Sequence, residues 1–251
     1  MEPEPRPVRS NALVLALALA GALLCAGFAG LGAWQVERLG WKQALMARVE
    51  RNLAAEPVPA PSPAGWAALG PADEYRRLSL QGEYDFDREV LVAASTELGP
   101  GFWVLTPLRT PEGHWILVNR GFVPPALRSK VPQGPAQPVA PGLLRWSEPG
   151  GGILQANDPA AGRWYSRDVA AIAAAQGLDG PVAPFFVDLQ AVPGAAEWPR
   201  AGLTVIRFRN HHLVYALTWF ALAAAVAGAT VFLLIDARRQ RRKDREDAHA
   251  G

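Results

Sequence analysis

Two arginines and two histidines lead directly into a long apolar stretch near the carboxyl end of the chain. His212 and Trp219 lie seven residues apart, so a helix would place both on one face, with Tyr215 close to it. A neutral imidazole at a membrane edge can ligate haem iron. In such a site a deeper aromatic ring could pack on the macrocycle, and Arg207 or Arg209 could pair with the haem propionates. The alternative is that these side chains only extend toward lipid headgroups, and the residues taken alone favour it.

The segment around Arg120 is a second candidate site. Gly121 follows a strand-like run and permits a turn, so Arg120 is predicted to leave the strand there. It would then be an exposed turn residue or a contact for an anion or a partner, and the residues favour the exposed turn. His114 lies beside another turn and is predicted to be solvated. Asp85 and Asp87 are two residues apart, and acids that alternate in this way along a strand usually face solvent.

Composition excludes several classes of protein. The 251 residues carry 25 basic and 23 acidic side chains, and a net charge of +2 argues against a nucleic-acid binder with a broad basic face. The single cysteine, Cys25, excludes an internal disulfide framework and a cysteine zinc site. The sequence has no phosphate-binding glycine loop, no His-Glu-x-x-His pair and no nucleophile elbow, which argues against a membrane-bound hydrolase.

Two uncharged apolar runs are predicted to be transmembrane helices. Ala12–Ala33 has 22 residues, about 33 Å as a helix, which is enough to cross a hydrocarbon core of about 30 Å. Because the apolar region of a signal peptide usually has only about 7–15 residues, a retained helix is favoured over a cleaved signal. Leu213–Ile235 has 23 residues, with Tyr215 and Trp219 in its first third, near where an aromatic belt would lie.

The short segments that flank these runs predict the orientation of the chain. Arg6 and Arg9 precede the first run, and residues 237–245, which follow the second run, include six basic side chains. Short basic flanks stay in the cytoplasm, whereas a long connecting segment crosses regardless of its charge. Both termini are therefore predicted to be cytoplasmic and the central segment extracytoplasmic.

The central segment is predicted to be mostly β. A helix continues over Trp34–Leu53, and the proline-rich residues 56–71 form a linker or an extended wrap. A further helix is predicted at Arg167–Gln176, N-capped by Ser166 and ended by Gly177. Six strand-like runs are predicted: Leu78–Leu80, Val90–Ala93, Phe102–Leu108, Trp115–Val118, Leu143–Trp146 and Phe185–Leu189. Phe102–Leu108 and Trp115–Val118 are predicted to form a hairpin.

Five sequence blocks occur in a recognisable order between about Ala33 and Phe220: GAWQVERLGWK, YRRLSLQGEY, GFWVLTPL, ILVNRGFVP and RNHHLVYALTWF. Together with the two-helix topology, they resemble the blocks of the surfeit-locus protein family, the cytochrome c oxidase assembly factors that include the yeast Shy-type protein. In the family block Asn-Asn-His-Leu-x-Tyr-Ala-x-Thr-Trp the histidine falls on His212, with His211 in place of the second Asn. Phe122 stands where many members have Trp.

The resemblance implies a non-enzymatic role, which is to help insert or stabilise haem a in the catalytic subunit of the oxidase. His212 is implied to be the axial ligand of the haem iron, with haem a bound transiently. The residues expected to bind the cofactor beside it are Tyr215, Trp219 and Arg209. Spacing to the two aromatic residues favours His212 over His211 as the ligand.

We therefore expect a membrane protein of the α+β class, in which two transmembrane helices flank a mostly-β extracytoplasmic domain with one or two helices. The expected divisions are a cytoplasmic N-terminus (1–11), the first span (12–33), the extracytoplasmic domain (34–212, with a helix and linker at 34–71 and the β core at 72–197), the second span (213–235) and a basic cytoplasmic tail (236–251).

The expected partners are the catalytic subunit of the oxidase and the lipid bilayer, with the haem a synthesis machinery as a further candidate and no nucleic acid. Arg120 and Gly121 are expected to contact the oxidase subunit or to support the contacting loop. An Ala-, Arg- and Pro-rich composition without a recognisable transit peptide predicts the plasma (inner) membrane of a bacterium and a place in its respiratory chain. The alternative function is a membrane-tethered extracytoplasmic sensor or ligand-binding module.

Overall fold

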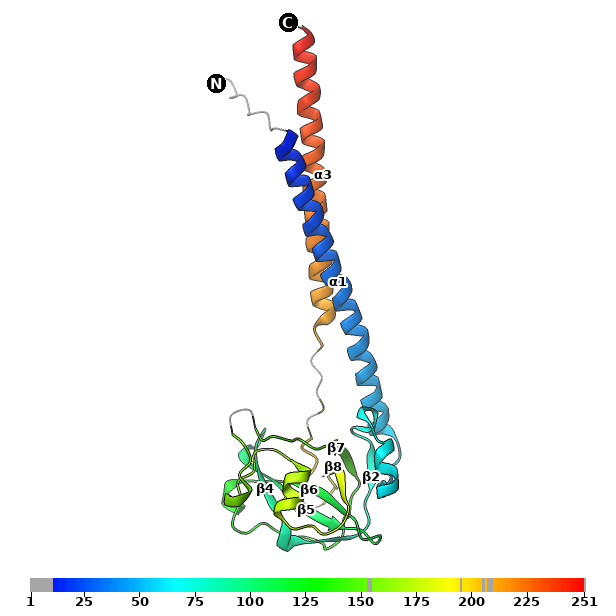
Figure 1. Ribbon diagram of the computed structural model, residues 1–251, viewed down its shortest axis with the longest axis vertical. Helices are drawn as coiled ribbons and strands as arrows, with labels where there is room; N and C mark the ends of the chain where they lie inside the picture. The colour runs from blue at the N-terminus through cyan, green and yellow to red at the C-terminus, as the bar shows by residue number, and fades with distance from the viewer. Residues whose placement is uncertain (1–10, 153–154, 195, 205, 207–209, 251) are drawn as a thin grey trace. The chain divides into compact units, whose positions relative to one another are not determined.

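The computed structural model describes residues 11–152, 155–194, 196–204, 206 and 210–250 (Figure 1). The chain divides into two compact units. One unit comprises Met1–Met46 and Phe208–Gly251, and the other comprises Ala47–Arg207. The second unit thus begins within the residues that were expected to lead into the β core.

The first unit consists of two long helices. Helix α1 spans Asn11–Ala54 and helix α3 spans His212–Ala250. Each contains a segment that is long and apolar enough to cross a membrane, which confirms the predicted pair of apolar helices. Helix α1 does not end at Ala33 but continues without a break through the second predicted helix, and α3 continues beyond Ile235 through the basic tail.

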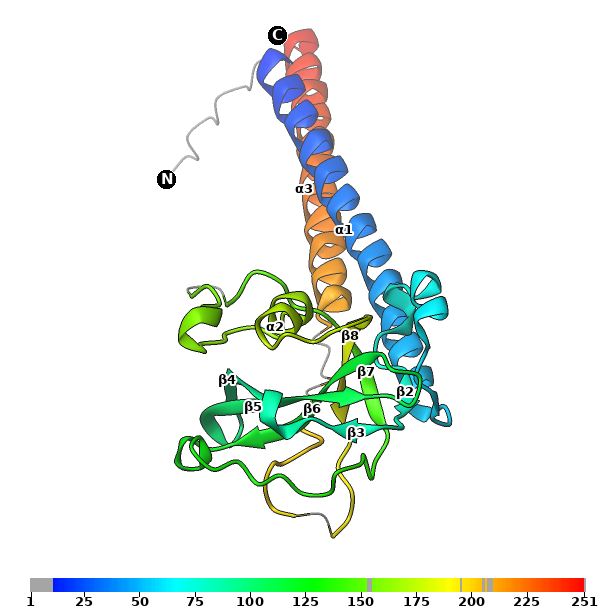
Figure 2. The same ribbon diagram turned by 60° about the horizontal axis from the view of Figure 1, so that its bottom comes forward.

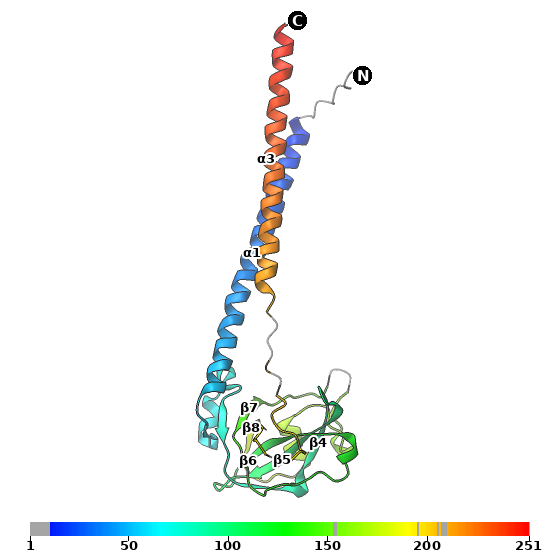
Figure 3. The same ribbon diagram turned by 180° about the vertical axis from the view of Figure 1, so that it is seen from behind.

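The two helices run antiparallel (Figures 1 and 3), and the contacts His212–Gln35 and Trp219–Phe28 join one stripe of each helix. On each helix the less exposed residues follow one another at alternating intervals of three and four positions. This is the spacing of the contact residues in two helices that pack as a left-handed pair. On α1 the stripe consists of Val14, Ala18, Gly21, Cys25, Phe28, Gly32 and Gln35. On α3 it consists of His212, Ala216, Trp219, Ala223, Val226, Thr230, Leu233 and Ala237.

The second unit is built on a mixed sheet in the order β1-β2-β7-β8-β6-β5-β3, with β4 paired to β5 (Figure 2). The pairs β1–β2 and β6–β8 are parallel and the others antiparallel. The strands are β1 (Val58–Pro59), β2 (Arg77–Ser79), β3 (Glu83–Tyr84), β4 (Val90–Thr96), β5 (Gly99–Arg109), β6 (Trp115–Val123), β7 (Gly142–Trp146) and β8 (Val182–Leu189).

All six predicted strand regions correspond to strands, and β5 and β6 form the predicted hairpin. The strands that the sequence did not predict, β1 and β3, have two residues each and are too short for an alternating pattern. The proline-rich residues 56–71 wrap onto the sheet, because they contain β1 and the 3-10 helix η1 (Pro63–Ala68), whose Trp66 packs on the core.

The predicted helix at residues 167–176 is present as α2 (Val169–Ala175), but its predicted cap is wrong. Asp168, not Ser166, is the N-cap, because its side chain accepts a hydrogen bond from the backbone N–H of Ala171 at 3.1 Å. The Ser166 hydroxyl instead accepts hydrogen bonds from outside the helix. Gly177 follows the helix with φ +60°, as expected of a glycine stop.

The sheet has a hydrophobic cluster on each face, because side chains alternate along β6. Trp115 and Leu117 belong to the cluster that packs against α2, where Ile172 is fully buried. Ile116 and Val118 belong to the other cluster. With both faces covered, every side chain of β6 is buried, and this strand forms the centre of the domain.

Candidate functional site

His212 is held by a hydrogen bond to the opposite helix. Its Nδ1 lies 2.7 Å from Oε1 of Gln35, a side chain that is only 9% exposed. An amide oxygen accepts but cannot donate, so Nδ1 carries the proton and the ring lone pair lies on Nε2. A hydrogen bond at one ring nitrogen sets the tautomer and orientation of histidines that ligate metal through the other.

Trp219 lies on the same face of α3 as His212, as predicted, and this face packs on α1. The Trp219 ring stacks on Phe28 with 5.7 Å between the ring centroids and 23° between the planes. Phe28 and Gln35 are also seven residues apart, so the two interhelical contacts are one heptad apart on both helices. Trp219 therefore holds the helices together and sets the register that brings Gln35 to His212.

The other predicted haem-site residues are placed differently. The Tyr215 side chain is 55% exposed and lies outside the packed stripe of α3. His211 is exposed as well. Arg209 and Arg207 fall outside the described residues. The structure thus brings His212 and Trp219 to one seam and leaves Tyr215 on the free surface of the helix.

Arg120 is buried, so the prediction of an exposed turn residue is wrong. Strand β6 continues to Val123, and Arg120 is the extra residue of a bulge, because Asn119 pairs with Leu105 and Gly121 with Val104. Gly121 has a positive φ of +133°, but it serves this bulge and not a turn. Only 6% of the Arg120 surface is exposed.

The buried guanidinium has partners on three sides. Its Nη2 pairs with the Glu89 carboxylate, and its Nε donates to the Thr106 hydroxyl at 2.8 Å. The Thr106 hydroxyl in turn donates to Glu89 at 2.7 Å. The Arg120 Nη1 donates to the carbonyl oxygens of Pro132 and Gln133 at 3.0 and 2.5 Å. Arg120 is thus neutralised by Glu89 and fastens the segment after β6 to the sheet.

His114 is also buried, at 3% exposure, so the prediction of a solvated turn residue is wrong. The Thr110 hydroxyl donates to the His114 carbonyl oxygen at 3.1 Å, so it must accept from the ring at Nδ1, 3.0 Å away. The Nε2 atom is buried without a hydrogen-bond partner among the described residues. Burial lowers the pKa of this imidazole, because the charged form would lose its hydration.

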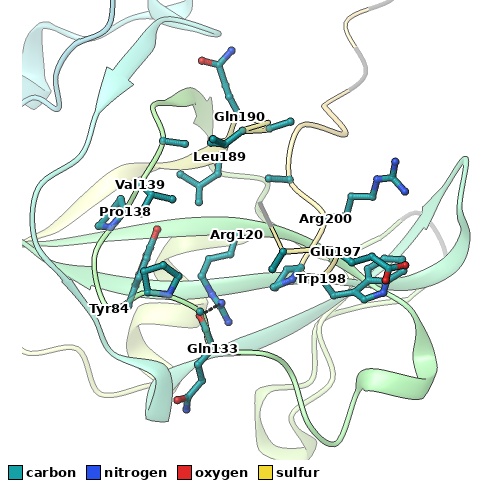
Figure 4. A pocket seen from close by; sticks show the side chains of 18 of the residues that line it. Tyr84, Arg120, Gln133, Pro138, Val139, Leu189, Gln190, Glu197, Trp198 and Arg200 are labelled. Atoms are coloured by element: carbon teal, nitrogen blue, oxygen red, sulfur yellow. Dashed lines mark hydrogen bonds between the residues drawn. The ribbon is translucent and has the colours of Figure 1, made fainter. Parts of the chain in front are cut away.

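A cavity of about 450 Å³ lies beside Arg120, between residues 133–140 on one side and residues 189–194 and 196–201 on the other (Figure 4). Tyr84 also lines it, and the Tyr84 hydroxyl is buried without a hydrogen-bond partner in the described part of the chain. Burial raises the pKa of this phenol, so the hydroxyl stays protonated and is able to donate.

Sequence reasoning missed Gln35, Glu89 and Tyr84. Gln35 could have been found from the sequence pattern. On α1 the residues of the stripe are three or four positions apart, and Gln35, at its end, is polar whereas the others are apolar. Glu89 lies 31 positions before Arg120, and no local pattern joins them. Tyr84 sits in a strand of two residues, which no periodicity marks.

Comparison with known proteins identifies the family. The sequence model of the SURF1 family matches residues 22–224. The chain belongs to the SURF1 family. It is 34% identical to Surfeit locus protein 1 of Mus musculus over 220 residues, which cover 79% of this chain and 69% of that protein. The Homo sapiens protein is 34% identical over 225 residues, covering 79% and 71%, and the Takifugu rubripes protein is 33% identical over 224 residues, covering 79% and 88%.

Membership of the SURF1 family confirms the resemblance found in the five sequence blocks. It makes this chain a member of a family of cytochrome c oxidase assembly factors. The matched region includes both His212 with its helix start and Gln35 of the opposite helix.

Proposed function

We propose that this SURF1-family chain helps insert or stabilise haem a in the catalytic subunit of cytochrome c oxidase. It would act by binding and positioning the cofactor and its partner, without catalysing a reaction. Its place would be the inner membrane of a bacterium, with both termini in the cytoplasm and the β domain outside. The haem a synthesis machinery is a further candidate partner.

The hydrogen bond between His212 Nδ1 and Gln35 is the observation that carries this proposal. It puts the proton on the nitrogen that faces α1 and the lone pair on Nε2, which is the donor a haem iron requires. A histidine that only extended toward lipid headgroups would need no such buried amide. The residues at this point therefore fit the cofactor that the family implies.

The neighbouring residues would each contribute to holding the cofactor. Haem a, when bound, supplies an iron that accepts the imidazole nitrogen of His212. Tyr215, exposed on the helix surface, offers an aromatic ring to an apolar macrocycle, and Trp219 keeps α3 in register with α1. Arg209 would pair with the propionates, as the sequence suggests.

The test is the absorption spectrum of the full-length protein purified from cells that make haem a. The wild type should show haem bands, and His212→Ala should lose or strongly shift them. His211→Ala is the matched control, because this neighbouring histidine is exposed and precedes helix α3, which begins at His212. Normal haem bands in His212→Ala would return the residue to a role at the lipid headgroups.

A further inference from the structure

Helix α3 continues past its apolar run into a basic segment, the red end of the helix in Figure 1. The charge-free run 213–235 is about 35 Å long as a helix, which covers a hydrocarbon core of about 30 Å. Residues 238–245, which follow it, contain six basic side chains and one acidic side chain. This segment therefore begins about 5 Å beyond the apolar run, within a headgroup layer that is about 5–8 Å thick on each side of the bilayer.

Four of the six basic residues share one side of the helix. This side, which we call the arginine face, consists of Arg238, Arg241, Arg242 and Arg245. At about 100° of rotation for each residue, these four positions lie within an arc of about 100°, and the other two basic residues lie outside it. All four arginines are exposed, and together with Glu246 they line one surface depression.

Carboxylates neutralise the arginine face only in part. Glu246 pairs with Arg242, with 2.9 Å between the carboxylate Oε1 and the arginine Nε. Neither Arg238 nor Arg241 forms an ion pair with a carboxylate of the described residues. The lining thus holds four cations against one anion, and this surplus of positive charge favours an anion from outside the chain.

The direction of the arginine side chains favours a membrane lipid as that anion. Side chains of an α-helix lean toward its N-terminus, and at this end of α3 the N-terminal direction leads back to the apolar run. The arginine face therefore leans toward the headgroups. A guanidinium binds phosphate through two parallel hydrogen bonds, and basic clusters next to a transmembrane helix are typical sites for anionic lipids. A nucleic acid fits less well, because its phosphates would have to approach from the side of the bilayer.

We propose that the arginine face binds the phosphate of an anionic phospholipid in the leaflet where α3 leaves the membrane. Arg238 and Arg241, the first two arginines of the face, contact the phosphate, and the other two add to the attraction. Because α3 is one continuous helix from His212 to Ala250, a lipid held here also fixes the depth of α3 in the bilayer. The proposal requires α3 to cross the membrane, and it does not depend on haem binding.

Native mass spectrometry of the full-length protein in detergent tests the proposal, because it counts the lipid molecules that remain bound to each protein molecule. The probes are phosphatidylglycerol, which is anionic, and phosphatidylcholine, which carries the same phosphate but no net charge. Titration with each lipid gives its dissociation constant, and phosphatidylglycerol should bind more tightly. Inorganic phosphate at the same concentration should not displace it, since free phosphate lacks the apolar tails.

Two matched double variants test whether the arginine face is the site. Arg238→Gln/Arg241→Gln removes two charges from the face, whereas Arg239→Gln/Lys243→Gln removes two charges of the same segment outside it. Both variants keep four of the six basic residues, so they share any effect of net charge. The first should weaken phosphatidylglycerol binding about 10- to 30-fold, at about fivefold for each arginine near the surface, and the second less than about threefold.

Equal losses of affinity in the two double variants would overturn the proposal, because the basic segment would then attract lipid without a defined site. Equal affinity of the wild type for the two lipids would also contradict it. Displacement of phosphatidylglycerol by inorganic phosphate or by a single-stranded oligonucleotide would assign the face to a soluble phosphate or to a nucleic acid. None of these results bears on the haem spectrum, so the proposed function is tested independently.

Discussion

At the residue scale, the Gln35 side chain decides which nitrogen of His212 is free to bind a metal. Gln35→Leu removes the acceptor while keeping the size of the side chain, so the ring loses its fixed tautomer and orientation. We expect haem affinity to fall about 10- to 100-fold, as it does when the outer partner of a metal-bound histidine is removed. Titration followed by absorption measures this change.

Gln35→Glu distinguishes positioning from packing in the same experiment. A carboxylate still accepts the Nδ1 proton, so binding should be retained, with a lower reduction potential because the imidazole becomes a stronger donor. If Gln35→Leu bound haem as tightly as the wild type, the hydrogen bond would serve only to join the two helices.

We expect substitution of Arg120 to lower the stability of the β domain, whether or not this residue also affects binding of a partner. Arg120→Ala leaves Glu89, whose side chain is only 13% exposed, without its cation, and loss of one partner of a buried pair typically costs about 3–5 kcal/mol in the free energy of unfolding. The double variant Arg120→Leu/Glu89→Leu should recover much of this loss, since it buries no unpaired charge. Thermal unfolding of the three proteins measures it, and an unchanged melting temperature in Arg120→Ala would contradict the pair.

His114 should make the β domain less stable in acid. Burial lowers the pKa of His114 below the value of about 6.5 expected in the unfolded chain, so the unfolded state takes up a proton first as the pH falls. The stabilisation is complete above about pH 6.5 and is lost as the pH falls through the folded-state pKa. His114→Gln should flatten the decline in melting temperature below that pH, whereas His211→Gln should leave it unchanged. A full decline in His114→Gln would assign it to another group.

At the scale of the elements, the helix pair depends on glycines at its seam. A Cβ at Gly21 would lie 2.1 Å from the Thr230 hydroxyl oxygen, and one at Gly32 would lie 2.7 Å from the Phe220 ring. Gly21→Leu should therefore push α1 and α3 apart and cost about 1–3 kcal/mol, as overpacking usually does. The melting temperature of the full-length protein in detergent measures this loss.

Gly27 gives the matched control for the seam. Beyond its chain neighbours and the backbone of its own helix, no atom of the described residues lies within 4 Å of a Cβ placed there, so Gly27→Leu adds the same side chain to the same apolar helix without a clash. Equal losses of stability in Gly21→Leu and Gly27→Leu would show that the helices do not pack along the stripe that contains His212 and Trp219.

At the scale of the whole molecule, the basic flanks of the two apolar helices predict the orientation in the membrane. A reporter enzyme that works only outside the cytoplasm should be active when fused after Pro141, within the β domain. It should be inactive when fused after Arg245, beyond the six basic residues of 237–245. The reverse pattern would place the β domain in the cytoplasm and remove the proposed route to the oxidase.

The sequence by itself determined the features that depend on local patterns. Uncharged runs of 22 and 23 residues fix the two apolar helices, because no longer-range information is needed to recognise a membrane-length segment. Short β-branched and aromatic runs identified the longer strands, and the seven-residue spacing placed His212 and Trp219 on one face. The ordered sequence blocks were sufficient to indicate the family.

The tertiary structure decided which side chains are buried and what they contact. Arg120 and His114 both looked like surface turn residues, since local sequence does not reveal which strands and loops will cover a side chain. Their burial depends on other segments, such as the one that brings Glu89 to Arg120. In the same way, Gln35 meets His212 across 177 positions of sequence, because two separate helices pack in one register. Such pairings follow from the packing of the whole chain, which local propensity does not encode.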